Sequence, residues 1–182
     1  MANKKNIVRR IKSAVISVSD KSNLKPLLQT LNRYNVKLIS SGGTFKAIRK
    51  LGYRCLEVSD YTGFNEILDG RVKTLHPKIH AGILNKRNNN SHKREIKKNN
   101  FQNIDLVIVN FYPFEKTLNT TKNHNKIIEK IDIGGPALVR SAAKNYNDVA
   151  VITSTNQYSA LIDQLKRFKG ATKLEFRKKL SQ

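Results

Sequence analysis

The sequence alternates short runs of β-branched and aliphatic residues with segments whose apolar residues recur at helical spacing. Residues 13–18 (SAVISV), 36–40 (VKLIS) and 53–58 (YRCLEV) have the composition of strands. The stretches between them, 24–34 and 44–51, repeat apolar residues with the period of a helix. Strands that alternate with helices pair in parallel, because each crossover helix returns the chain to the same end of the sheet. This half of the chain therefore predicts a β-α-β-α-β unit.

The second half of the chain continues the alternation. Residues 104–112 (IDLVIVNFY) and 148–153 (DVAVIT) are typical of buried strands, while 136–145 and 156–168 are typical of helices. With 182 residues and no clear linker, we expect a single domain over residues 1–182. The predicted fold class is α/β, a three-layer α/β/α sandwich with a mostly parallel sheet. Ligands of such folds bind beyond the carboxyl ends of the strands.

The chain is strongly basic, and its formal net charge of +22 by itself suggests a polyanionic partner. However, the lysines are scattered among asparagines, and the densest basic run, residues 85–100, has almost no aromatic side chain on which a base could stack. Specific nucleic-acid binding is therefore not expected. No apolar run approaches the roughly 18 residues of a membrane span, and the single cysteine, Cys55, fits a reducing compartment. We expect a cytoplasmic protein without a membrane partner.

Two predicted strand ends carry small polar residues that suit a phosphate group. In LISSGGTFKAI, two glycines between a strand and a helix allow backbone N–H groups to approach an anion at the helix N-terminus. A plain glycine turn with a threonine N-cap would look similar. The SVSDK segment ends the first strand and could join the same site, or could simply be a helix-capping turn. The candidate phosphate ligands are Ser17, Ser19, Lys21, Ser41, Gly42, Gly43 and Thr44.

The stretch DGRVKTLHPKIH, residues 69–80, allows two interpretations. Asp69, His76 and His80 could hold a metal ion, but Pro77 disfavours a helix through both histidines and no clustered carboxylates support the site. Alternatively, in an extended segment Arg71 and Lys73 point to the same face beside Thr74 and bind an anion. We favour anion binding and expect no metal, although solvated charges in a loop remain a third interpretation.

Two further segments place polar groups where predicted elements meet. NFYPFE ends a buried strand with Asn110 and Tyr112, and IDIGGPALVRSAAKN sets Asp132 before a Gly-Gly turn and a helix that contains Lys144. Tyr112 could equally be a half-buried strand aromatic, and Lys144 a partner of the helix dipole. Local sequence alone does not decide between these interpretations.

Taken together, these segments form a specific pattern. SVSDK, SGGT, SDYTGF, DGRVKTLHPKIHAGIL, NFYPFE, IDIGGP and RSAAKN, in this order, resemble the IMP cyclohydrolase domain of the bifunctional purine biosynthesis protein family, over about residues 11–160. The resemblance implies a methylglyoxal-synthase-like fold and a hydrolase that closes 5-formamidoimidazole-4-carboxamide ribonucleotide to inosine monophosphate without cofactor or metal. It also implies a purine nucleotide as the ligand and a homodimer.

The resemblance also implies a set of site residues. A carboxamide nitrogen attacks a formyl carbon, so the site must align the groups, move protons and stabilise an oxyanion. The catalytic residues matched are Lys73, Tyr112, Asp132 and Lys144. Around the base it places Arg71, Thr74, Asn110, Gly134 and Gly135, with the phosphate on the seven residues of the two strand ends named above.

The sequence departs from the family at its C-terminus. The family continues into a transformylase domain with a folate site, whereas this chain ends at Gln182, so we expect no transformylase activity from it. A non-catalytic nucleotide-binding or regulatory domain of the same fold is the alternative interpretation. Methylglyoxal synthase is a weaker rival, because DGRVKTLHP and NFYPFE do not resemble its signature.

Overall fold

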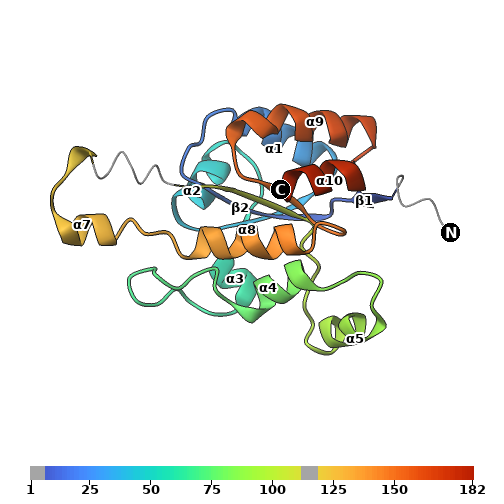
Figure 1. Cartoon of the computed structure of the whole chain (residues 1–182), viewed down its shortest axis with the longest axis horizontal. Coiled ribbons are helices and arrows are strands. Elements are labelled where there is room, and N and C mark those ends of the chain that lie inside the picture. The colour runs from blue at the N-terminus through green and yellow to red at the C-terminus, as the bar shows by residue number, and fades with distance from the viewer. Residues whose placement is uncertain (1–6, 112–118) are drawn as a thin grey trace.

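The computed structural model describes residues 7–111 and 119–182, and its centre is a parallel sheet (Figure 1). Five strands lie side by side in the order β4-β3-β2-β5-β6, and every neighbouring pair is parallel. This arrangement confirms the predicted α/β class. The chain leaves the central strand β2 toward β3 and β4 and then returns to β5, so the order reverses between β2 and β5. The strands are β2 (Ser13–Val18), β3 (Lys37–Ser40), β4 (Leu56–Glu57), β5 (Leu106–Asn110) and β6 (Ala150–Ile152).

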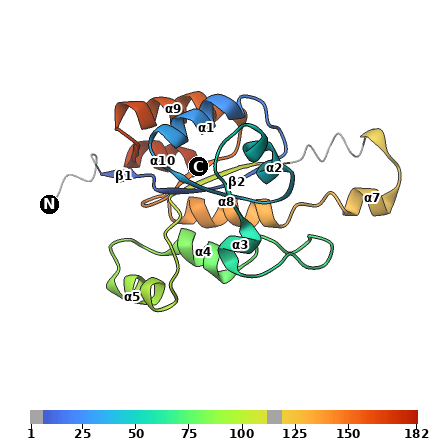
Figure 2. The ribbon, with the colours of Figure 1, turned by 180° about the vertical axis from the view of Figure 1, so that it is seen from behind.

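Helices cover both faces of the sheet, because alternate residues of each buried strand point to opposite sides. Ala14 and Ile16 of β2 pack on one side with α1, α2 and α9, while Val15 packs on the other side with α3, α4 and α8. Figures 1 and 2 show these two layers above and below the sheet. The helices are α1 (Leu24–Arg33), α2 (Gly42–Lys50), α9 (Tyr158–Arg167), α3 (Val58–Thr62), α4 (Pro77–Leu84) and α8 (Gly134–Lys144).

The structure shifts several predicted boundaries and adds short elements. Only Leu56–Glu57 of the predicted strand 53–58 pairs with the sheet, because Val58 already begins α3. A small antiparallel sheet of β1 (Val8–Arg10) and β7 (Ala171–Lys173) has no alternating pattern that would reveal it in the sequence. The basic run forms α5 (Asn90–Lys98), which has no buried residue and is therefore a solvated helix. Other short helices are α7 (His124–Ile128), a 3-10 turn at Thr155–Gln157 and α10 (Leu174–Leu180).

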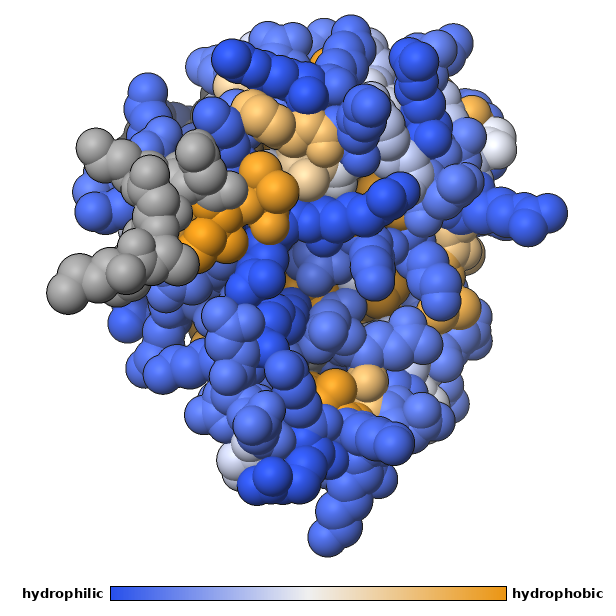
Figure 3. Space-filling view, turned by 90° about the vertical axis from the view of Figure 1, so that its right-hand side faces the viewer, coloured by the Kyte–Doolittle hydropathy of each residue, from blue (hydrophilic) through white to orange (hydrophobic). Residues whose placement is uncertain are grey.

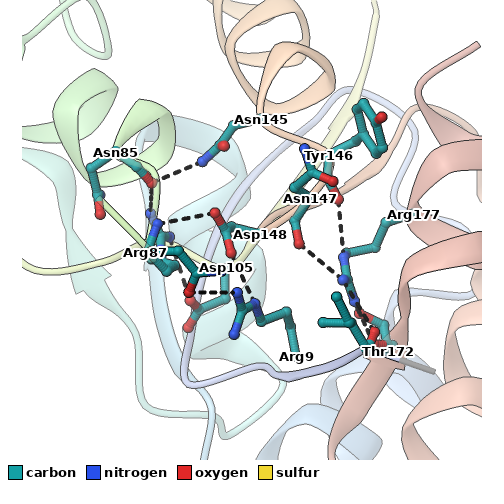
Figure 4. A network of polar contacts seen from close by, with 12 residues as sticks. Arg9, Asn85, Arg87, Asp105, Asn145, Tyr146, Asn147, Asp148, Thr172 and Arg177 are labelled. Atoms are coloured by element: carbon teal, nitrogen blue, oxygen red, sulfur yellow. Dashed lines mark hydrogen bonds and ion pairs between the residues drawn. The ribbon is translucent and has the colours of Figure 1, made fainter. Parts of the chain in front are cut away.

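The amino ends of the strands are held by buried carboxylates (Figure 4). Asp105 accepts hydrogen bonds from the backbone N–H groups of Lys12 and Ser13, at the start of β2. Asp148 accepts from Arg9 Nε and from the backbone N–H of Arg87. These contacts join β1, β2 and the segment after α4, so the amino ends of the strands have a structural role.

Arg177 fastens α10 to the same end of the sheet (Figure 4). Its side chain is fully buried and donates to the backbone carbonyls of Tyr146, Asn147 and Thr172. Desolvation lowers the pKa of its guanidinium to about 10. The last helix is therefore an integral part of this domain.

The surface beyond the amino ends of the strands is shown in Figure 3, and it is mostly hydrophilic with small, separate hydrophobic areas. Among the described residues, no helix has both the length and the apolar composition needed to cross a membrane.

Candidate functional site

A cavity of about 480 Å³ lies beyond the carboxyl ends of the strands. Its walls come from the ends of β2 and β3, from the loop before α4, and from the segment that joins α7 to α8. Figures 1 and 2 both show that loop and that segment extending side by side past the sheet. Its lining is Ser17, Ser41, Asp69, Gly70, Arg71, Lys73, Thr74, Ile128, Glu129, Ile131, Asp132, Ile133, Gly134 and Gly135.

Eight of the residues proposed from the sequence line this cavity, although they come from four separate stretches of chain. A smaller hollow is also lined by Ser41 and Lys73, and in addition by Glu66, which does not line the main cavity. The proposed residues that line the main cavity are Ser17, Ser41, Arg71, Lys73, Thr74, Asp132, Gly134 and Gly135.

The SSGGT segment forms a turn that leads into a helix, as an anion cradle requires. Ser41 has extended backbone dihedrals at the N-cap of α2, and its side chain makes no capping hydrogen bond. Gly42 has a φ of +53°, a conformation that favours glycine. A β-carbon placed on Gly42 would lie 3.7 Å from Lys73 Nζ, so the lysine ammonium group lies over the turn. The free N–H groups of the first helical turn and this ammonium group together suit an anion.

Thr44 has a structural role in this turn. Its buried hydroxyl accepts from the Val18 N–H at 3.0 Å and donates to the Val18 carbonyl at 2.9 Å. The hydroxyl therefore uses its only donor, and one of its acceptor positions, to join the start of α2 to the end of β2. Gly42 and Gly43 follow the lining residue Ser41 but do not themselves line the cavity, and a β-carbon on Gly43 would meet no atom within 4 Å.

The turn after β2 is organised by Asn110 at the end of β5. The Asn110 side-chain oxygen accepts from the N–H groups of Ser19 and Asp20, at 2.6 and 2.9 Å, and its amide group donates to the Asp20 carbonyl. Lys21 Nζ donates to the carbonyls of Val18 and Ser19. In this structure Ser19, Lys21 and Asn110 shape the turn and do not line the cavity.

Arg71 and Lys73 both line the cavity, although Arg71 lies in a turn and Lys73 in a bend and not in the extended segment that we expected. Each is ion-paired with a carboxylate: Arg71 with Glu129 at the end of α7, and Lys73 with Glu66 at 2.6 Å. The hydrogen bond and charge of Glu129 raise the pKa of Arg71. The cations at the cavity are thus held by partners from two different segments.

Asp132 and the Gly-Gly turn form the opposite wall. Asp132 Oδ1 accepts from the Gly135 N–H at 2.8 Å, and a β-carbon on Gly135 would lie only 2.4 Å from Oδ2. A β-carbon on Gly134 would lie 2.6 Å from Thr74 Oγ1. The two glycines therefore allow Asp132 and Thr74 to approach the N-terminus of α8.

The two histidines of the DGRVKTLHPKIH stretch have other partners. His76 is the N-cap of α4 and accepts from the Lys78 N–H, while His80 Nδ1 lies 2.9 Å from Ser141 Oγ. Burial lowers the pKa of His80, and a hydrogen bond with the backbone of Thr74 opposes this decrease. Across residues 7–111 and 119–182, no three His, Cys, Asp or Glu side chains gather as metal ligands would.

Two of the four proposed catalytic residues are not placed at the cavity by this structure. Tyr112 lies outside the described residues. Lys144 is exposed at the last position of α8, ten residues and thus about 15 Å along the helix from Gly134. Lys73 and Asp132 are the two that line the cavity.

Sequence reasoning missed the acidic and apolar residues of the site. Glu129 and Glu66 pair with the cations, and the exposed isoleucines 128, 131 and 133 line one wall. The wall of isoleucines suits a flat ring, and the opposite wall of hydroxyls and cations suits a phosphate. A hydrophobic residue on both sides of Asp132, in a segment otherwise rich in polar residues, was the available sign of the apolar wall.

Comparisons with known proteins agree with the observed fold. A family model described as the MGS-like domain matches residues 23–137, and one described as the AICARFT/IMPCHase bienzyme matches residues 142–182. The structure described as the crystal structure of ForH has a TM-score of 0.83 and 31% identity, and the match covers 94% of this chain and 90% of that one.

Curated relatives named bifunctional purine biosynthesis protein PurH match nearly the whole chain. The protein of Prochlorococcus marinus is 53% identical over 93% of this chain, and that of Clostridioides difficile is 49% identical over 93%. In both cases the chain spans about a third of the relative's length (33%). The MGS-like match covers more than half of the sequence and the observed sheet agrees with it, so this chain belongs to the MGS-like domain family and is closely similar to one part of PurH proteins.

Proposed function

We propose that this chain is an IMP cyclohydrolase, which closes the ring of 5-formamidoimidazole-4-carboxamide ribonucleotide to form inosine monophosphate and water. The observation that carries the proposal is the cavity at the carboxyl ends of the strands. It brings together the N-terminus of α2, the cations Arg71 and Lys73, Asp132 and a wall of isoleucines. A nucleotide needs these features together: N–H and hydroxyl groups for the phosphate, an apolar wall for the ring, and cations and an aspartate for the reacting atoms. The similarity to PurH proteins supports the same assignment.

The reaction forms one C–N bond and breaks one C–O bond. The carboxamide nitrogen attacks the formyl carbon, and the formyl oxygen becomes a hydroxyl group that leaves as water. One proton of this water comes from the carboxamide nitrogen and the other from the formamido N–H. Lys73 stabilises the developing oxyanion, and Asp132 orients the carboxamide and takes its proton. We assign proton relay to Tyr112 and a second charge contact to Lys144, as the resemblance implies.

The phosphate is assigned to the N-terminus of α2, with Ser17 and Ser41 beside it. In this assignment the anion binds next to the lining residue Ser41, at the N–H groups that begin α2, while Thr44, Lys21 and Asn110 keep the two turns in shape. No cofactor or metal takes part, so chelation with EDTA is expected to leave turnover unchanged. The family resemblance further predicts a cytoplasmic homodimer, and sedimentation of the purified chain measures the oligomer.

Turnover of the formamido nucleotide by the purified chain tests the proposal, with inosine monophosphate followed by its absorbance. Lys73→Ala should lower kcat by on the order of 10², as expected when a charge that stabilises the transition state is removed. Asp132→Asn should lower it as well, whereas Lys97→Ala in the exposed helix α5 should not. Binding of inosine monophosphate without turnover would instead favour the non-catalytic, regulatory interpretation. Release of methylglyoxal from dihydroxyacetone phosphate would favour the rival enzyme.

A further inference from the structure

Glu66 is a charged residue that lines the smaller hollow beside the cavity, and the proposed catalytic set does not include it. It lies seven residues before Lys73, and its Oε2 atom is 2.6 Å from Lys73 Nζ. We propose that Glu66 is a positioning residue, which holds the Lys73 ammonium group at the place where the reaction needs a positive charge. This inference rests on the proposed cyclohydrolase function, and it adds a residue that acts only through Lys73.

The backbone between the two residues explains why they meet. Ile67 and Val72 exchange two backbone hydrogen bonds of 3.3 and 3.4 Å and form an antiparallel bridge. The chain reverses over residues 68–70, whose φ angles are +55°, +53° and +85°. The next pair outward from the bridge is Glu66 and Lys73. Residues directly opposite each other in an antiparallel pair project from the same face, so the turn brings carboxylate and ammonium together.

The side chain of Lys73 also lies close to the backbone of two glycines. A β-carbon on Gly70 would lie 2.5 Å from Lys73 Cε and 2.8 Å from its Nζ, so the lysine lies directly across that glycine. On another side, Nζ lies 3.7 Å from the β-carbon position of Gly42 in the phosphate turn. Glu66 supplies the charged contact that fixes the end of a chain with four rotatable bonds.

This ion pair is better explained by positioning than by stability. The Glu66 side chain is 58% exposed and the Lys73 side chain 30%, and exposed pairs contribute little to folding. A carboxylate beside an anion site also repels a bound nucleotide, so the pair weakens ground-state binding. Glu66 therefore favours the reaction only if the ammonium group that it orders stabilises the transition state more than it stabilises the bound ground state.

This reasoning predicts a specific kinetic signature. Glu66→Gln should lower kcat by about 10-fold to 10²-fold, the range expected for a misplaced catalytic group, while KM stays equal or falls. In the Lys73→Ala background, Glu66→Gln should cause no further loss, because it acts through that lysine. Glu95→Gln is the control: it removes an exposed carboxylate from helix α5, which lines neither the cavity nor the smaller hollow, and it should keep wild-type kcat.

A second measurement uses the protein without ligand. NMR of the Lys73 side chain should show an ordered ammonium group in the wild type and a mobile one in Glu66→Gln. An active wild type together with unchanged kcat in Glu66→Gln, or an equally ordered ammonium group in both proteins, would overturn the role of Glu66 alone. A folded wild type that neither binds inosine monophosphate nor forms it would overturn the proposed function, and with it the catalytic purpose of the ion pair.

Discussion

Gly42→Ala tests whether the SSGGT turn before α2 depends on its backbone conformation. The φ angle of Gly42 is +53°, in the left-handed region, where an L-residue with a β-carbon costs roughly 1–2 kcal/mol. The added methyl group would lie 3.7 Å from Lys73 Nζ, which is ordinary van der Waals contact, so the cost arises from the backbone and not from a clash. We therefore expect Gly42→Ala to lower the free energy of unfolding by about 1–2 kcal/mol.

The neighbouring glycine provides a matched control. Gly43 is also in the first turn of α2, but it has no positive φ, and a β-carbon there would meet no atom within 4 Å. Gly43→Ala should leave the free energy of unfolding unchanged or raise it by up to about 1 kcal/mol, because alanine is the better helix former. Urea denaturation of both variants gives the comparison. Equal stability of the two variants would refute the reasoning.

The same substitution has a consequence for the ligand. If the turn relaxes, its N–H groups no longer point at one anion, so Gly42→Ala should weaken binding of inosine monophosphate in a calorimetric titration. Neutralising the exposed lysines of the basic run should matter much less, because solvent and salt screen them beyond roughly 8 Å. Normal binding by Gly42→Ala, with binding abolished by the lysine changes, would place the anion site on α5. The lysines to neutralise are Lys86, Lys93, Lys97 and Lys98.

Three further outcomes follow from one buried side chain, Arg177, and two half-buried ones, His80 and Cys55. Arg177→Met should lower the free energy of unfolding by about 3 kcal/mol or more, measured in urea, because three backbone carbonyls lose their donor. The pKa of His80 is lowered by burial, so the unfolded state binds more protons as pH falls past about 6.5; stability should fall from pH 7.5 to 5.5, and less so in His80→Asn. Burial raises the pKa of Cys55 to about 11, so at pH 8 its reaction with a disulfide reagent should be far slower than in the unfolded chain.

Much of the fold follows from local sequence patterns. The central strand and the helix after it begin where expected, and the predicted apolar face of that helix, including Leu27 and Leu31, is fully buried. The strand predicted at residues 53–58 was too long, because its composition carries no sign that Val58 begins a helix. The β1 and β7 pair also escaped prediction, since strands of three residues are too short to show a period.

The residues that line the cavity were predictable only where a local motif contributes to it. Arg71 and Lys73, which the sequence analysis grouped together, both line the cavity, and the glycine pattern indicated the positive φ of Gly42. Whether a polar residue lines the cavity or shapes a turn depends on tertiary partners that the sequence does not show. Thr44 and Asn110 are such cases, because their hydrogen bonds join elements that are 26 and 90 or more residues apart in sequence.

The most direct test of the central claim is to titrate inosine monophosphate into isotope-labelled protein and follow the backbone amide signals. We expect saturable changes at Ser41, Gly42, Gly43, Gly134 and Gly135, at the N-termini of α2 and α8, with little change in α5. Changes confined to α5, or none at millimolar nucleotide, would contradict the claim that this cavity is a purine nucleotide site.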